Sequence, residues 1–344
     1  MRRAISLLAG LFLLAVLVLA AGPAHVARLL ASVRPSVLAA SLTLLVLLRV
    51  GLFIRWMMLV RPVAPAPIGR HLRIFLTGSF LNSFGPGNVA GDSYRVASLR
   101  PFVPSTGEIV GCVVRERLYG LAGYLMGYLV AFALCLTLDR VGHEEVFAAV
   151  AAVSLAGLVG LLALPLAAGR LARFPSRARL AWLQRWVADT TKLGPSRRAV
   201  QCLAISLAGW GLWCLAVIVL GRGLGLELPV PILAVIATLT ELIRFVPVSF
   251  QGLGVREVAF AGLVELAGGP PARGASVAIV LYLLVGLTLL AGAPLSWLVG
   301  AYGSRTRSGA QQGHPSPPAG GQLCSVDEPV WYRVRSLGPR AARR

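Results

Sequence analysis

Residues 36–60 read SVLAASLTLLVLLRVGLFIRWMMLV, and this stretch decides the fold class. Charge interrupts it only at Arg49 and Arg55, and it exceeds the ~20 apolar residues that a helix needs to cross a bilayer. It also lacks the strict alternation of apolar and polar residues that a membrane β-barrel strand requires. Because a helix satisfies its own backbone hydrogen bonds in lipid, the stretch predicts a transmembrane α-helix.

The rest of the chain extends this prediction. Of its 344 residues, 57% are hydrophobic and 13% are charged, and its mean hydropathy is +0.77. A soluble protein with so few polar residues could not cover its surface. Further apolar runs occupy residues 4–22, 118–138, 146–168, 199–220 and 275–301. We therefore predict an all-α, polytopic transmembrane bundle with about six full spans over residues 1–302, followed by a disordered basic cytoplasmic tail over residues 303–344.

Two other apolar stretches are too short to cross. Each runs into a glycine-containing break and is followed by a second short helical piece: 74–84, 85–92 and 93–99 in the first half, and 230–246, 247–254 and 257–266 in the second. A short helix, a glycine-rich break and another short helix are typical of a re-entrant hairpin. If the breaks are only helix kinks, each hairpin becomes a crossing pair or a single tilted span, and one tilted span in each half brings the count to eight with both termini still inside.

The basic residues indicate the orientation of the chain. They cluster around Arg2, around Arg61, in segment 170–198, which has eight basic residues and one acid, and around Arg305. All of these fall on the cytoplasmic side if six spans have both termini inside. The first hairpin then enters from the cytoplasm and the second from outside. This order predicts an inverted-topology repeat, which transporters use to build a site that opens alternately to each side.

Several function classes are not favoured. The net charge of +20 lies in loops between apolar spans, where topology explains it, so we predict no nucleic-acid partner. The sequence contains no CxxC pair, no HExxH or similar histidine spacing, and no familiar catalytic motif, so we predict no metal and no cofactor. Cysteines 112, 135, 202 and 214 lie in or beside apolar helices and are expected to pack as small apolar residues.

Ionisable residues within apolar segments are the candidate site, because charge inside a bilayer is costly and usually faces a cavity. Arg49 lies deep in its span, where it either pairs with an acid or contacts substrate. Arg55 lies nearer the surface and is expected to reach it by snorkelling. Segment 115–117 (Arg-Glu-Arg) is expected to begin the third crossing near the cytoplasmic surface, where the alternative is an interfacial charge cluster.

The residues after the two breaks extend the candidate site. Asp92 is expected to cap the helix that follows the first break, with Arg95 one turn on. Free N–H groups at a helix start, together with an arginine fork, are suited to phosphate. Glu241 and Arg244 are spaced to pair on one helix face. The predicted substrate-binding residues are Arg49, Asp92, Arg95, Glu116, Arg117, Glu241, Arg244, Gly252, Gly254, Arg256 and Glu257. This set favours an anionic headgroup over an alkali cation.

Three motifs in this order resemble a known family. They are GNVAGDSYR at 87–95, RERLYGL at 115–121 and PVSFQGLGVRE at 247–257. The chain is similar to the lysylphosphatidylglycerol synthase transmembrane region, also called the flippase-like family, over roughly residues 5–302. The resemblance implies a domain that moves lipids between leaflets. Full-length aminoacyl-lipid synthases add a soluble catalytic domain after this region, whereas here only the short tail follows, so we expect no aminoacyl transfer.

The sequence therefore predicts a flippase or transporter in the bacterial inner membrane. Its substrate would be an anionic or aminoacylated (glyco)phospholipid-type lipid, and the expected partners are membrane lipids with anionic headgroups. The alternatives are an intramembrane transferase that acts on a lipid-linked substrate, and a non-catalytic partner of a separate lipid synthase. Segment 170–198 could bind that synthase or anionic lipid heads. A homo-oligomer is also possible.

Overall fold

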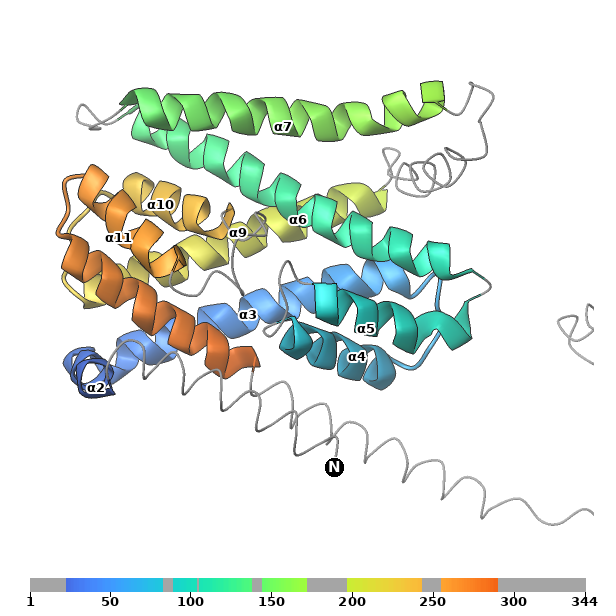
Figure 1. Ribbon diagram of the computed structural model, residues 1–344, viewed down its shortest axis with the longest axis horizontal. Coiled ribbons are helices and arrows are strands. Elements are labelled where there is room, and N and C mark those ends of the chain that lie inside the picture. The colour runs from blue at the N-terminus through green and yellow to red at the C-terminus, as the bar shows by residue number, and fades with distance from the viewer. Residues whose placement is uncertain are drawn as a thin grey trace, which may run out of the picture. The chain divides into compact units, whose positions relative to one another are not determined.

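The computed structural model describes residues 23–82, 89–103, 105–137, 144–171, 197–242 and 255–289 (Figure 1). These residues belong to one compact unit, Met1–Gly303. The predicted first span, the tips of both glycine breaks, most of the basic segment 170–198 and the tail lie outside them. Within the described ranges all regular structure is helical, which confirms the all-α prediction.

Most helices overlap the predicted segments, but α2 lies in none of them and α5 begins within the predicted first break. The described helices are α2 (Pro23–Ser32), α3 (Pro35–Val60), α4 (Ile68–Leu81), α5 (Val89–Leu99), α6 (Thr106–Cys135), α7 (Glu144–Leu171), α9 (Arg197–Gly223), α10 (Val230–Leu242), α11 (Val255–Leu266) and the helix Pro271–Leu289. A short 3-10 turn, η2, covers Arg100–Phe102. Four described helices are long and apolar enough to cross a membrane: α3, α6, α9 and Pro271–Leu289. The protein is therefore a multi-pass helical membrane protein.

The start of α6 differs from the sequence prediction. Ser105 caps the helix, because its hydroxyl accepts a hydrogen bond of 3.2 Å from the backbone N–H of Gly107. The helix thus begins twelve residues before the predicted span at residue 118. Arg115–Arg117 therefore lie within α6 rather than at its first turn. Glu116 instead lies about 15 Å along the helix.

Helices α3 and α9 form the centre of the bundle. Leu48 lies against Gly209, and Val37 lies against Gly223, so the two helices run antiparallel. α6 crosses α9 at a close contact, where Gly127 faces the indole ring of Trp210. The buried apolar cluster between them includes Tyr128, Trp213, Leu220 and Leu233. Burial of these large side chains is the main stabilising contribution in this part of the bundle.

The two predicted hairpins are two packed pairs of short helices, α4 with α5 and α10 with α11. α4 has 14 residues and α10 has 13, so each is about 20 Å long and shorter than the ~30 Å hydrocarbon core. Gly91 of α5 lies directly against the carbonyl of Gly78 in α4. The absence of side chains at both positions allows this close approach.

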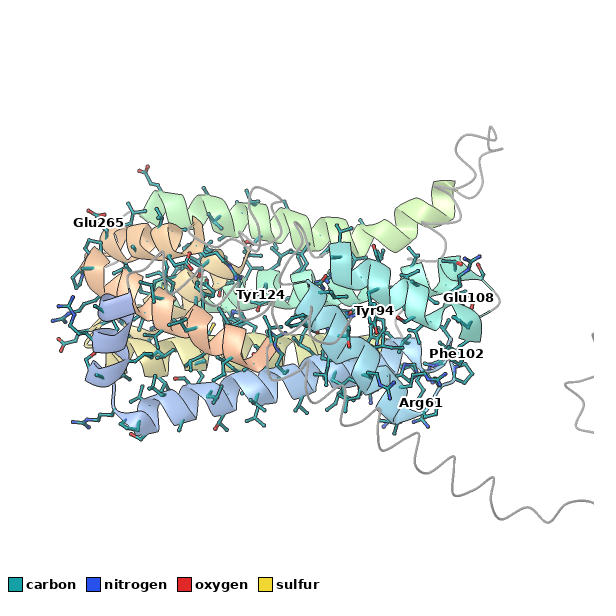
Figure 2. The ribbon with its side chains drawn as sticks, turned by 60° about the horizontal axis from the view of Figure 1, so that its bottom comes forward. Arg61, Tyr94, Phe102, Glu108, Tyr124 and Glu265 are labelled. Atoms are coloured by element: carbon teal, nitrogen blue, oxygen red, sulfur yellow. The ribbon has the colours of Figure 1, made fainter. Side chains whose placement is uncertain are left out.

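The two pairs join the bundle at opposite ends of α3. Next to the end of α3, the Arg70 guanidinium at the start of α4 lies 4.8 Å from the Phe102 ring, which follows α5. At the other end, Gly269, which follows α11, lies against Leu228, which precedes α10. The separation is visible in Figure 1, and Figure 2 shows Arg61 and Phe102 at the end away from Glu265. This arrangement is the one expected for an inverted-topology repeat.

Candidate functional site

A cavity of about 130 Å³ lies where the inner ends of the two helix pairs meet α3, α6 and α9. Its wall contains polar and charged residues from both halves of the chain, such as Asn82 at the end of α4 and Glu241 near the end of α10. The charged residues on the wall are Arg49, Arg55, Arg95, Glu116, Arg117, Glu241 and Arg256. Among the described wall residues five arginines face two glutamates, so this part of the wall has an excess of positive charge.

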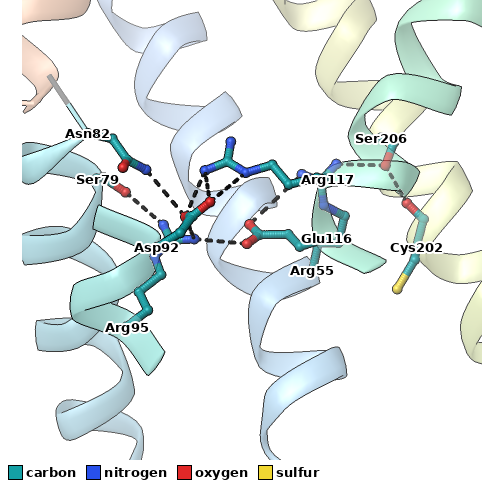
Figure 3. Close-up of polar contacts among 9 residues, drawn as sticks. All are labelled: Arg55, Ser79, Asn82, Asp92, Arg95, Glu116, Arg117, Cys202 and Ser206. Atoms are coloured by element: carbon teal, nitrogen blue, oxygen red, sulfur yellow. Dashed lines mark hydrogen bonds and ion pairs between the residues drawn. The ribbon is translucent and has the colours of Figure 1, made fainter. Parts of the chain in front are cut away.

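Arg95 on α5 is the most extensively held of these arginines. Its Nη1 donates to Glu116 Oε2 at 2.8 Å, and its Nη2 donates to the Ser79 hydroxyl at 3.2 Å (Figure 3). Its guanidinium also lies between the rings of Trp56, at 4.9 Å, and Phe75, at 5.0 Å. Helices α3, α4 and α6 therefore all fix one side chain of α5.

Glu116 on α6 links Arg95 to α3 and α9. Arg55 Nη2 lies 4.0 Å from Glu116 Oε1, and Arg55 Nη1 donates to the Ser206 hydroxyl at 2.7 Å. Arg55 has a relative exposure of 6%, so the expectation that it snorkels to the surface is wrong. Buried charge persists in such a place only when it is paired and hydrogen-bonded, and Glu116 and Ser206 meet that need.

Asp92 and Arg117 form a second ion pair beside the first. Arg117 Nε donates to Asp92 Oδ2 at 3.0 Å, and Arg117 Nη2 donates to Oδ1 at 2.8 Å, which is a bidentate geometry (Figure 3). The predicted capping role of Asp92 is not the one observed. α5 begins at Val89, so Asp92 lies within the first turn and its carboxylate is directed to α6. The Arg117 side chain keeps 33% exposure.

The second half repeats the pairing with other partners. Arg256, the second residue of α11, donates from Nη2 to Glu241 Oε1 of α10, and both side chains are buried. The Arg256 guanidinium lies 4.6 Å from the centre of the Tyr282 ring. In each half, therefore, an arginine from the second short helix is buried, paired with a glutamate and stacked on an aromatic ring.

The structure brings together most, but not all, of the predicted site residues. Arg49 lines the cavity from α3, as do Arg95, Glu116, Arg117, Glu241 and Arg256 from their helices. Asp92 is not on the cavity wall, but it is the ion-pair partner of Arg117. Glu257 is not on the cavity wall, and neither of its carboxylate oxygens has a hydrogen-bond partner. The predicted partners Arg244, Gly252 and Gly254 lie outside the described residues.

Other wall residues were not predicted from sequence. Tyr124, Trp210 and Trp213 contribute aromatic surface, and Ser79 and Ser206 contribute hydroxyls that accept hydrogen bonds from arginines. Asn82 had a usable signal, since it is a polar amide at the end of an apolar helix and beside the first break. Its side-chain oxygen accepts a hydrogen bond of 2.7 Å from the Gly91 N–H. Trp210 and Trp213 had no comparable sequence signal, because apolar helices often contain tryptophan for packing alone.

The charged wall is suited to anions more than to metal ions. In the described ranges, no group of three or more His, Cys, Asp or Glu residues is placed to hold a metal. Guanidinium groups instead offer fixed, planar sets of N–H donors that match phosphate oxygens. The arrangement can therefore bind an anionic group between helices that belong to opposite halves of the chain.

Taken together, the fold and site define a class: a multi-pass helical membrane protein with an arginine-rich cavity between two oppositely attached helix pairs. A family model described as the lysylphosphatidylglycerol synthase TM region matches residues 3–292, and the chain belongs to this family. This membership indicates a role connected with membrane lipids. Comparisons with curated proteins and with solved structures found no match.

Proposed function

We propose that this protein is a lipid flippase or transporter that moves a phospholipid-type substrate between leaflets by holding its headgroup in the arginine-rich cavity. The observation that carries the proposal is the convergence of Arg95 and Arg256, one from each half, on a single cavity in the bundle. A headgroup that crosses the bilayer needs compensation for its lost hydration, and fixed charged donors supply it.

The opposed attachment of the two helix pairs supports alternating access. A site between two inverted halves can open to one side when one half moves and to the other side when the other moves. α4 and α5 contact the cavity from one end, and α10 and α11 contact it from the other. Each pair is held to the cavity by its own buried arginine, so movement of either pair changes the cavity.

In this function the protein moves the lipid without forming or breaking a covalent bond in it. An intramembrane transferase needs a general base that is free to accept a proton from its substrate. On the described cavity wall the carboxylates are Glu116 and Glu241, and each is hydrogen-bonded to an arginine. At these two glutamates the arrangement supports binding over proton transfer. A separate lipid synthase that docks at segment 170–198, and self-association, remain predictions.

The proposed location is the bacterial inner membrane with both termini in the cytoplasm. Arg61, Arg70 and Arg100 lie at the end of the bundle where α4 and α5 attach. Arg197 at the start of the antiparallel helix α9 lies at the same end. Under the positive-inside rule this end faces the cytoplasm.

Reconstitution tests the proposal. The purified full chain is placed in vesicles that contain a trace of headgroup-intact, acyl-labelled fluorescent phosphatidylglycerol, and dithionite is added outside. We expect the protein to expose the inner-leaflet label to quenching, and Arg95→Gln and Arg256→Gln to slow this exposure. Arg273→Gln is the matched control, because Arg273 is exposed and donates to the Gly225 carbonyl outside the cavity. Rates equal to those of protein-free vesicles would overturn the proposal.

A further inference from the structure

We infer that Asn82 is a positioning residue of the transport site: it aligns the Asp92 carboxylate with Arg117 and so fixes the direction in which Arg117 faces the cavity. This inference rests on the proposed function and adds to it a residue that acts through two others. Its basis is a chain of hydrogen bonds that runs from the end of α4 through α5 to α6 (Figure 3).

Asn82 is fixed to both sides of the first glycine break. Its backbone N–H donates to the Gly78 carbonyl at 3.0 Å, where α4 ends. Its side-chain oxygen accepts a 2.7 Å hydrogen bond from the N–H of Gly91, the third residue of α5. The first N–H groups of a helix have no partner within that helix, so this bond satisfies one of them. Asn82 is 6% exposed, and it therefore links α4 to α5 from a buried position.

The bond to Gly91 determines which way the amide of Asn82 points. An N–H group can donate only to the oxygen of the amide, so the oxygen faces Gly91 and the amide nitrogen faces away from it. On that other side, Asn82 Nδ2 lies 3.5 Å from Asp92 Oδ1. This contact is long for a hydrogen bond, but its polarity is favourable, because an ionised carboxylate accepts and cannot donate.

Asp92 passes this orientation on to α6. Its carboxylate accepts from Arg117 Nη2 at 2.8 Å and from Arg117 Nε at 3.0 Å, and Arg95 Nη1 lies 3.8 Å from Asp92 Oδ1. A planar guanidinium that is held at both Nε and Nη2 cannot turn without breaking one of these bonds. The Nη1 edge of Arg117 is therefore turned away from Asp92 in a fixed direction.

Arg117 is an arginine through which such positioning can affect transport. Its side chain lines the cavity and is 33% exposed, whereas the side chains of Arg95 and Arg256 are 4% and 6% exposed. Arg117 therefore presents accessible donors that these two arginines do not. A binding group needs neighbours that hold its geometry to within about 0.5 Å. Loss of the Asn82 contact would let Asp92, and with it Arg117, change direction.

Asn82→Asp tests this chain of contacts with a readout that a merely structural role would not produce. The introduced carboxylate can still accept from the Gly91 N–H, but when ionised it repels Asp92 and competes for Arg117. In acid the two carboxyl groups share a proton, which again provides a donor towards Asp92. The other charged groups that face the Asp92 carboxylate are Arg95 on α5 and Arg117 on α6, and both keep their charge throughout.

Transport at two pH values measures the effect. Acyl-labelled phosphatidylglycerol is followed by its extraction with external albumin, since dithionite decomposes in acid. At about pH 8 we expect Asn82→Asp to move the lipid about tenfold more slowly than the unsubstituted protein, and at about pH 5 to recover most of this difference. The same reduction at both pH values would overturn the inference, because a general loss of packing has no reason to depend on pH. Unchanged rates at both pH values would overturn it as well.

The double variant Asn82→Asp/Asp92→Asn is the matched control. It contains the same two kinds of group but one carboxylate instead of two, so no proton can be shared. Beside Arg95 and Arg117 a single carboxylate stays ionised at both pH values. The rate relative to the unsubstituted protein should therefore be the same at both. If the double variant shows the pH dependence of Asn82→Asp, that dependence arises elsewhere and the inference is wrong.

Thermal unfolding in detergent gives a readout that does not depend on transport. When Asn82→Ala and Arg117→Gln are combined, the loss of unfolding midpoint should be smaller than the sum of the two single losses, because both act on Asp92. Asn82→Ala with Arg115→Gln should be additive, since Arg115 donates to the Gly111 carbonyl instead. Additive losses for Asn82 and Arg117 would overturn the inference. Absence of transport by the unsubstituted protein would contradict the proposed function alone, and the unfolding measurement would still decide the inference.

Discussion

Arg95 on α5 and Glu116 on α6 form a buried ion pair with a 2.8 Å hydrogen bond, in a region that also holds Arg55. One carboxylate therefore compensates two buried guanidinium groups, which come from α3 and α5. Because these helices contact α6 at the same glutamate, the pair connects the first short-helix pair to the long helices of the bundle.

Substitution of Glu116 should be strongly destabilising. Glu116→Gln removes the charge that compensates Arg95 and Arg55, and loss of one partner from a buried pair typically costs about 3–5 kcal/mol. We expect a clearly lower thermal unfolding midpoint in detergent. Glu108→Gln, at the first turn of the same helix, is the control and should change the midpoint little. Equal midpoints for the two variants would show that Glu116 is not needed for charge compensation.

The contact between α4 and α5 depends on a missing side chain. A Cβ at position 91 would lie 1.9 Å from the Gly78 carbonyl oxygen, which is backbone and cannot rotate away. Gly91→Ala should therefore separate the two helices, lower the unfolding midpoint and slow transport. Gly262→Ala in α11 is the control, because a Cβ there meets nothing within 4 Å. That change should be neutral or stabilise by about 0.5–1 kcal/mol through helix propensity. Similar behaviour of the two variants would contradict the packing argument.

The indole N–H of Trp210 depends on one acceptor. It donates to the Thr238 hydroxyl at 2.8 Å, and this bond joins α9 to α10 at the cavity wall. Thr238→Val preserves the shape of the side chain but leaves the indole N–H unsatisfied, with an expected loss of about 1–3 kcal/mol. Thermal unfolding followed by tryptophan fluorescence measures the change. Thr43→Val, at an exposed site on α3, should have little effect. An equal loss of unfolding free energy in both variants would show that the hydrogen bond between α9 and α10 does not stabilise the protein.

Because the two helix pairs attach at opposite ends of the bundle, cysteines introduced at those two ends should be labelled from opposite sides of the membrane. Arg61 and Glu265 are exposed at opposite ends of the bundle (Figure 2). In a Cys324→Ser background, Arg61→Cys should react with a membrane-impermeant maleimide only from the cytoplasmic side. Glu265→Cys should react only from the outside. The four described native cysteines are buried and provide a low background. Labelling of both sites from one side would contradict the inverted arrangement.

Two errors of the sequence prediction have one cause. Arg55 was assigned to the surface because it lies near the end of an apolar span, and Asp92 was assigned to a helix cap because a glycine precedes it. Both interpretations use only neighbours in the sequence. The structure shows that Ser206 and Arg117, which are 151 and 25 residues away, determine where these side chains point.

The sequence by itself determined the helical spans, the two pairs of short helices and the family. These features depend on local quantities, namely the length of an apolar run, the position of a glycine break and short motifs, and lipid permits few alternatives to a helix. Only the tertiary structure decided which charges meet. Glu116 pairs with Arg95 rather than with its chain neighbours Arg115 and Arg117, because side chains adjacent on a helix point in different directions and the partner must come from a packed helix. The cavity between the two halves arises from that packing, and with it the excess of arginines over glutamates on its described wall.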